Sequence, residues 1–174
     1  MVMDYLPSTV DICAARTHEV LHIARAAVFG ITDIHRVGII HGGITERSLA
    51  FKDDQLVFVD FGRASGTPHW EDVSEEINDS GTCRIEVTHR SDLRTLALVL
   101  VSLTGATVPR LPRNPLAEHR VKFQDEVNNF DIDVLLGHLP LSLNPLRDFI
   151  MCAFALGIEE KPDYNLLQRA FDRT

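Results

Sequence analysis

The stretch "IIHGGITERSLAFKDDQLVFVDFG" (residues 39–62) decides the fold. Two β-like runs within it, "SLAF" and "QLVFVD", flank the polar residues "KDD", and this pattern predicts two short strands joined by a tight hairpin turn. The run "GII" before His41 predicts another short strand that leads into a polar loop. We therefore expect a small hairpin to carry the polar motifs of the chain.

Helical patterns lie on both sides of this hairpin. Over residues 17–36 apolar residues recur every three or four positions, which predicts a helix with one apolar face that ends at Gly38. Further along the chain, Ser91 or Asp92 is expected to cap a helix that runs to about Leu103. Because this second helix is apolar nearly all round, we expect it to be buried.

The remaining segments predict a loop and further helices. Residues 63–90 are polar and contain glycine, proline, asparagine and serine, which indicates a long ordered loop. Residues 115–136 give weaker helical signals, Asn144 and Pro145 are typical of a helix start, and Pro162 begins a last helix. The expected fold is mainly α, as a single domain over residues 1–174.

Composition excludes several classes of function. The chain is 45% hydrophobic and 24% charged, which is ordinary for a globular protein. The net charge of −8, from 17 basic and 25 acidic side chains, argues against a surface that binds nucleic acid or an anionic membrane. The three scattered cysteines predict no disulfide framework or zinc site, and no apolar run reaches membrane-spanning length. With no signal-peptide pattern, we expect an intracellular protein, cytoplasmic or nuclear.

Six stretches carry a resemblance to a known family: "VMDYL", "GIIHGGITERSLAF", "VFVDFGRA", "GTCR", "SDLRTLALVLVSLTG" and "EKPDYNLLQRAF". In this order they resemble the C-terminal lobe of a protein kinase, and most closely the casein kinase 1 and vaccinia-related kinase group. The fifth stretch resembles the helix whose first aspartate, here Asp92, braces the catalytic loop. The resemblance implies a mainly α, kinase-like C-lobe with one or two small β-hairpins. Because the chain starts at the hinge-like segment, we expect the N-terminal lobe to be absent.

The resemblance also implies where the reactive side chains should be, and three of them are replaced. Gly43 stands where an active kinase of this type has the aspartate that orients the attacking hydroxyl. Thr45 stands where the lysine that neutralises the moving phosphoryl group belongs, and Ser48 where an asparagine holds a second magnesium ion. Glu46 lies three residues beyond Gly43 and is a poor substitute for the lost aspartate. We therefore predict no catalytic residues and no enzyme activity.

The Asp60-Phe61-Gly62 motif has two interpretations. Asp60 is the one retained candidate for contact with magnesium or nucleotide, so weak ATP and magnesium binding is left open although no cofactor is expected. In the structural interpretation, Phe61 fills a core niche, Gly62 permits a turn and Asp60 caps nearby amides. His41 is expected to pack beneath the loop and to bond backbone, as its counterpart in the family does.

Two surfaces are candidates for binding protein. The segment "HWEDVSEEINDSG" places acidic residues around the only tryptophan, and its protein-binding candidates are Trp70, Glu71, Asp72, Glu75 and Glu76. A solvated loop with Trp70 in the core is the alternative. Without an N-terminal lobe, the upper face should also expose apolar surface, near Leu6, Leu49, Phe51 and Phe61.

Together these features predict a truncated, catalytically inactive pseudokinase that acts as a protein-binding or regulatory module. Its expected partner is another protein, such as an active kinase or a kinase N-lobe, and a homodimer is a further option. The alternative is a fragment of a serine/threonine kinase with residual ATP and magnesium binding, completed by a separate N-lobe. A degenerate gene product without a selected role also stays open.

Overall fold

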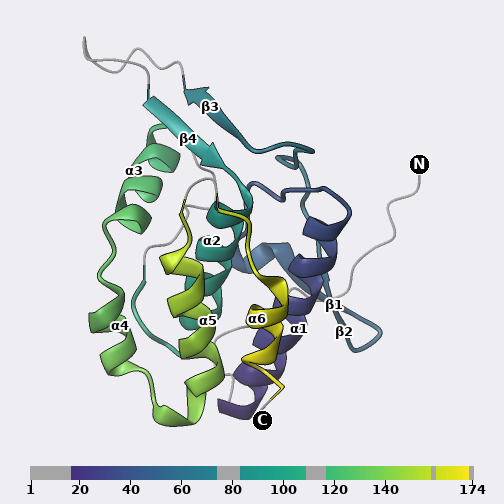
Figure 1. Cartoon of the computed structure of the whole chain (residues 1–174), viewed down its shortest axis with the longest axis vertical. Coiled ribbons are helices and arrows are strands. Elements are labelled where there is room, and N and C mark those ends of the chain that lie inside the picture. The colour runs from purple at the N-terminus through teal and green to yellow at the C-terminus, as the bar shows by residue number, and fades with distance from the viewer. Residues whose placement is uncertain (1–16, 74–82, 109–116, 158–159, 173–174) are drawn as a thin grey trace.

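The computed structural model describes residues 17–73, 83–108, 117–157 and 160–172, and these residues form a mainly helical fold with two small antiparallel sheets (Figure 1). The helices are α1 (Thr17–Arg36), α2 (His89–Ser102), α3 (Ala117–Asn128), α4 (Ile132–His138), α5 (Asn144–Ala155) and α6 (Tyr164–Arg169). The strands are β1 (Leu49–Lys52), β2 (Gln55–Phe58), β3 (His69–Val73) and β4 (Cys83–Val87). Two 3₁₀ turns, Glu46–Ser48 and Leu141–Leu143, complete the described elements.

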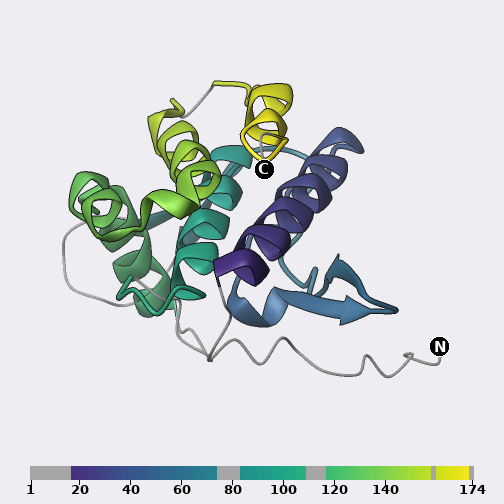
Figure 2. The same ribbon diagram turned by 90° about the horizontal axis from the view of Figure 1, so that it is seen from below.

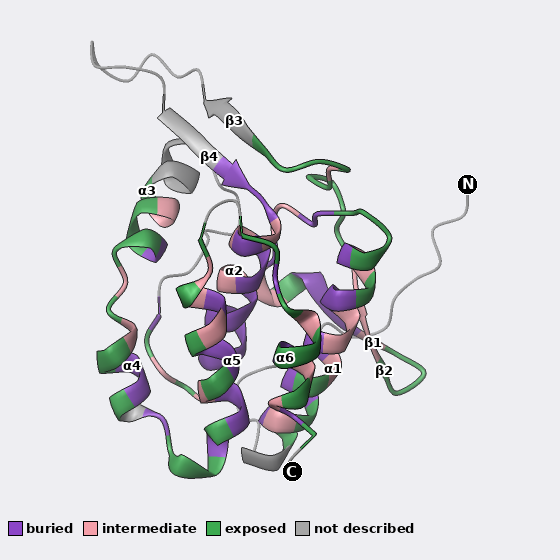
Figure 3. Ribbon diagram, in the orientation of Figure 1, coloured by how far each residue is buried: buried purple, intermediate pink, exposed green. Residues whose placement is uncertain are grey.

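Helix α2 forms the centre of the hydrophobic core. It packs against α1 and α5, and its apolar side chains are buried on nearly every face, as the purple colour in Figure 3 shows. The buried side chains of α2 include Leu93, Leu96, Ala97, Leu98, Leu100 and Val101. Burial of a helix on all sides requires apolar residues all round it. The predicted burial of this helix is confirmed.

The start of α2 differs from the prediction. Thr88 is the N-cap, because its hydroxyl accepts a hydrogen bond from the Ser91 amide, and the Ser91 hydroxyl in turn accepts one from the Thr88 amide. This reciprocal arrangement is a capping box, and it satisfies two backbone donors at the helix end. The predicted cap at Ser91 or Asp92 is therefore wrong. Asp92 lies inside the first turn, where its carboxylate is available for another task.

The predicted hairpin is confirmed, with strands at residues 49–52 and 55–58 where the pattern placed them at 48–51 and 55–60. Strands β1 and β2 pair antiparallel, with Lys52 opposite Gln55, and Asp53 and Asp54 form the turn with φ values of 49° and 61°. Two successive residues with positive φ are typical of the tight turn that matches the twist of a two-stranded hairpin. The hairpin packs on α1 (Figure 2). A Cβ at Gly30 would lie 3.1 Å from the Phe58 ring, so this glycine allows the close approach.

The predicted long loop over residues 63–90 is wrong in part, because it contains a second antiparallel pair. Strands β3 and β4 pair with Glu71 opposite Ile85, and Figure 1 shows this sheet at one end of the molecule, near α3. The turn-forming residues between and before these short strands hide them in the sequence. The strand expected around Ile40 is reduced to one isolated bridge, between Ile40 and Ser65.

The C-terminal helices follow the prediction with shifted ends. The weak signal over residues 115–136 corresponds to α3 and α4, and Asp131 caps α4 by accepting from the amides of Asp133 and Val134. Helix α5 covers Asn144–Ala155 with Leu143 at its N-cap, so the helix start lies where it was predicted, one residue earlier than a cap at Asn144 would place it. Helix α6 starts at Tyr164 rather than Pro162. Among the described helices, none is both long and apolar enough to span a membrane.

Candidate functional site

The candidate site is the loop of residues 41–48, and the Asp92 carboxylate holds one end of it. Asp92 is 2% exposed, and its Oδ2 accepts from the His41 amide at 2.6 Å while its Oδ1 accepts from the Gly42 amide at 2.9 Å. The His35 Nε2 lies 3.0 Å from Oδ2. Three N–H donors around one buried carboxylate offset the cost of removing it from water. The predicted role of Asp92 as a brace for this loop is confirmed.

Side chains from α2 and α6 contact His35, which lies at the end of α1. Its Nδ1 lies 2.8 Å from the Tyr164 hydroxyl of α6, and the His89 ring approaches it edge-on at 4.7 Å. Burial, and then the Asp92 carboxylate, raise the pKa of the Tyr164 phenol. Burial, and then the neighbouring His35, lower the pKa of the His89 imidazole, with Asp92 acting in the opposite direction.

His41 lies beneath the loop and supports it. Its side chain is fully buried, and Nε2 donates to the Val59 carbonyl oxygen at 3.0 Å. The Phe61 ring covers it at a centroid distance of 4.8 Å. The Nδ1 atom of His41 is buried and has no hydrogen-bond partner in the part of the chain that the structure describes. His41 is therefore a structural residue, as predicted.

The two glycines of the loop are both close to Arg63. Gly42 has φ = +71°, and a Cβ there would lie 2.6 Å from the Arg63 carbonyl oxygen, so a side chain is strained and obstructed. At Gly43 a Cβ would lie 3.1 Å from Cδ of the Arg63 side chain. Arg63 thus fills the space beside the position where the resemblance places the orienting aspartate of an active kinase.

Thr45 and Ser48 form hydrogen bonds with each other and with the loop backbone. Ser48 is fully buried, accepts from the Thr45 amide at 3.1 Å and donates to the Gly43 carbonyl oxygen at 3.3 Å. The Thr45 hydroxyl accepts from the Arg47 amide at 3.2 Å. The Glu46 carboxylate accepts from the Ser102 hydroxyl at 2.8 Å, which ties it to the end of α2. This contact further weakens the case for Glu46 as a substitute for an aspartate at Gly43.

The structural interpretation of Asp60, Phe61 and Gly62 needs correction. Phe61 is 42% exposed instead of filling a core niche, although its ring lies over His41. Gly62 does lie in a turn, which the Ala64 amide closes by donating to the Phe61 carbonyl oxygen at 3.0 Å, but the left-handed φ of 65° belongs to Asp60. The Asp60 carboxylate is exposed and makes no hydrogen bond or ion pair in the described residues, so the predicted capping of amides is wrong.

The residues of this site do not fit a two-magnesium centre. In the described ranges, no group of three or more histidine, cysteine, aspartate or glutamate side chains could hold a metal ion. Asp60 is a single carboxylate, and the Ser48 hydroxyl is buried in contacts within the loop. Magnesium requires several oxygen ligands, and one carboxylate leaves most of them to water or substrate.

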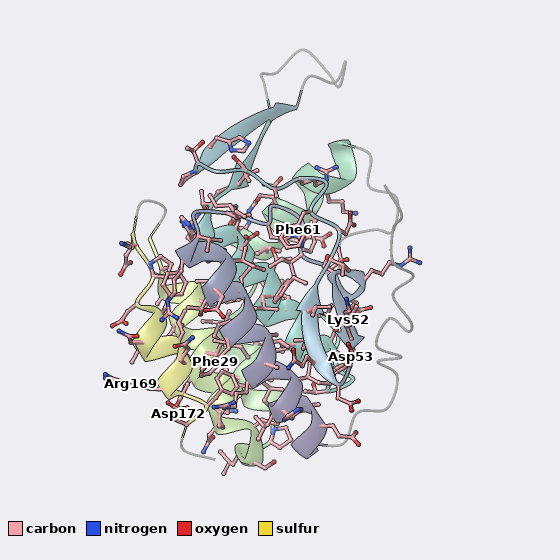
Figure 4. The ribbon with its side chains drawn as sticks, turned by 90° about the vertical axis from the view of Figure 1, so that its right-hand side faces the viewer. Phe29, Lys52, Asp53, Phe61, Arg169 and Asp172 are labelled. Carbon is pink, nitrogen blue, oxygen red and sulfur yellow. The ribbon has the colours of Figure 1, made fainter. Side chains whose placement is uncertain are left out.

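The candidate protein-binding residues are brought together only in part. Trp70, Glu71 and Asp72 lie on β3, while Glu75 and Glu76 fall outside the described residues. Of the predicted apolar face, Leu6 also falls outside them. Leu49 is 1% exposed, so its predicted exposure is wrong, and Phe51 is half-buried against the core. Phe61 remains, and in Figure 4 it lies between the β1–β2 turn and the β3–β4 sheet.

Sequence reasoning missed His35, Arg63 and Tyr164 as parts of the site. His35 and Asp92 are 57 positions apart, and Tyr164 is 129 positions from His35. No local spacing links such distant residues, so only the packing of α1, α2 and α6 shows the connection.

Comparison of the sequence with protein-family models finds no match, and comparison with curated proteins finds none either. The kinase resemblance therefore rests on the six motifs and stays a prediction.

Proposed function

We propose that this chain is a catalytically inactive, kinase-like module that acts by binding another protein. The observation that carries the proposal is that the Thr45 and Ser48 side chains form hydrogen bonds within the loop of residues 43–48. Ser48 is fully buried and bonded to Thr45 and Gly43, and Arg63 lies beside Gly43. In the resembled family these positions orient the hydroxyl, neutralise the phosphoryl group and bind a metal ion, and here none presents a group suited to those tasks.

Phosphoryl transfer depends on positioning and charge neutralisation more than on covalent chemistry. An orienting or general-base group typically contributes about 10²–10⁴ in rate. Glycine at position 43 offers no such group, and the neutral Thr45 offers no positive charge. The effects of these two replacements on the rate of phosphoryl transfer need not be additive, but each of them lowers that rate.

A protein surface is the proposed point of contact, with Phe61 as its anchor. The Phe61 ring is exposed, sits on the rigid support of the buried His41 and lies beside the exposed Asp60. Aromatic side chains, phenylalanine included, are enriched in the cores of protein interfaces. The proposed partner is an active kinase or a kinase N-lobe, with a second copy of the chain as the competing occupant.

A transfer assay with binding measurements tests the proposal. We expect no transfer of radiolabel from ATP above the solvent background, and capture of a kinase or isolated kinase N-lobe that Phe61→Ser weakens. Leu166→Ser is a matched control, because Leu166 is also exposed but lies on α6. A clean monomer that captures neither partner, or labelling that Asp60→Asn abolishes, would contradict the proposal.

The alternative is a kinase fragment that retains ATP and magnesium binding. It is favoured by the exposed Asp60 carboxylate, which has no partner in the described residues. A thermal-shift titration separates the two functions. A rise in melting temperature with ATP and magnesium, lost in Asp60→Asn, would favour the alternative, whereas no shift at millimolar ATP would favour the binding module.

A further inference from the structure

A continuous chain of hydrogen bonds links the last helix to the candidate site. It runs from the Tyr164 hydroxyl on α6 to His35 Nδ1 at 2.8 Å, and from His35 Nε2 to Asp92 Oδ2 at 3.0 Å. Asp92 then accepts from the backbone amides of His41 and Gly42. The side chains of His35 and Asp92 are almost fully buried, so the surrounding residues rather than bulk water satisfy them.

The direction of each hydrogen bond follows from Asp92. Its carboxylate already accepts from two backbone amides, so it acts as an acceptor toward His35 as well, and Nε2 carries the proton. A neutral imidazole has one donor and one acceptor, which leaves Nδ1 as an acceptor. The Tyr164 hydroxyl is then the donor to Nδ1. A phenol is protonated at neutral pH, and burial raises the pKa of Tyr164 further, so its hydroxyl can serve as this donor.

We propose that Tyr164 is a positioning residue that holds the His35 ring in the orientation in which Nε2 donates to Asp92, and that α6 thereby controls the loop at His41 and Gly42. Without the Tyr164 hydroxyl, Nδ1 of His35 is a buried acceptor without a donor. A rotation of the ring that lets Nδ1 find another donor relieves that cost, but it also moves the Nε2–H donor away from Asp92. The loop brace then loses one of its three N–H donors.

The regulatory role of α6 rests on the proposed function, because the loop supports the Phe61 side chain that is proposed to bind a partner. His41 links the two regions, because its backbone amide donates to Asp92 and its ring lies under Phe61. A ligand or partner that displaces α6 would loosen the loop and weaken binding at Phe61. Binding at Phe61 would in this way be regulated by α6, which lies far from Phe61 in the sequence.

The test uses Tyr164→Phe in the full chain, with Leu166→Ala as a control on the exposed side of the same helix. Nitrogen-15 NMR of the His35 ring reports which nitrogen carries the proton, and hydrogen exchange reports the opening of the His41 and Gly42 amides. We expect the Nε2–H tautomer in the unaltered protein. In Tyr164→Phe we expect the same tautomer, but an Nε2 proton that exchanges with solvent faster because the ring loses its fixed orientation. We also expect the His41 and Gly42 amides to exchange on the order of tenfold faster while the core amides of α2 keep their rates.

Several outcomes would overturn the inference. A proton on Nδ1 of His35 in the unaltered protein would refute it even if Tyr164→Phe did not fold. Unchanged exchange rates of the His35 Nε2 proton and of the two amides, or equal acceleration of every amide in the variant, would reduce Tyr164 to a packing role. The same local effect in Leu166→Ala would show that the hydroxyl is not its cause. Since no partner enters these measurements, failure would leave the proposed binding function standing.

Discussion

At the scale of single residues, Gly42 shows how closely the loop is constrained. Its φ is positive, and its backbone approaches the Arg63 carbonyl so closely that a Cβ would lie 2.6 Å from that oxygen. Gly38 has a similar φ of 79°, but nothing lies within 4 Å of a Cβ placed there. We predict that Gly42→Ala lowers the free energy of unfolding by about 3 kcal/mol, from strain plus the collision. Gly38→Ala should cost about 1 kcal/mol, from φ alone. Urea denaturation of both variants measures the difference, and equal losses would disprove the close contact.

His89 gives a prediction for the pH dependence of stability. Its pKa is lowered in the folded protein, so the unfolded chain binds the proton more tightly. Stability therefore rises with pH through this transition and falls as the pH drops below the ordinary histidine pKa of about 6.5. We predict that His89→Gln loses less stability than the unaltered protein between pH 7.5 and pH 5.5. Thermal denaturation at several pH values measures this, and a steeper loss in His89→Gln would contradict it.

At the scale of elements, local patterns were sufficient where the apolar period was long or the turn chemistry was plain. The core helix α2, the helix α1 and the β1–β2 hairpin were predictable for this reason. Strands β3 and β4 were not, because five-residue strands among turn-forming residues carry little periodicity. The N-cap of α2 was misplaced because Thr88, Ser91 and Asp92 all belong to residue types that favour caps.

The candidate site was predictable only where a family pattern supplied the positions. Gly43, Thr45 and Ser48 could be singled out by comparison with the catalytic loop, and Asp92 by comparison with its brace. The occupancy of the space beside Gly43 by Arg63, and the connection of Asp92 to Tyr164, depend on packing between segments distant in sequence. The predicted exposure of Leu49 was wrong because Leu49 lies on the inner side of β1 and packs into the hydrophobic core.

At the scale of the whole molecule, the β3–β4 sheet meets α2 at a buried point at the end of β4. Glu86 and Val87 at the end of β4 are buried, and Arg90 in the first turn of α2 forms an ion pair with Glu86. The Glu86 carboxylate also accepts from the Thr88 hydroxyl, the N-cap of α2. Separating the two members of a buried, hydrogen-bonded ion pair is costly, because each charge is then left unpaired in the protein interior.

We therefore predict that the β3–β4 sheet and the helices unfold together. Trp70 on β3 is the only tryptophan, so its fluorescence reports the sheet, while far-UV circular dichroism reports the helices. In the unaltered protein both signals should give the same urea midpoint, as a two-state transition requires. Glu86→Gln removes the charge of the pair while keeping the side chain's size, and it should shift the fluorescence midpoint below the circular dichroism midpoint.

Asp172→Asn is the matched control, because its ion pair with Arg25 is exposed and far from the sheet in sequence. Separate midpoints in the unaltered protein would mean that the sheet bearing Trp70, Glu71 and Asp72 is not held by the core, and that any binding through it is independent of the loop braced by Asp92.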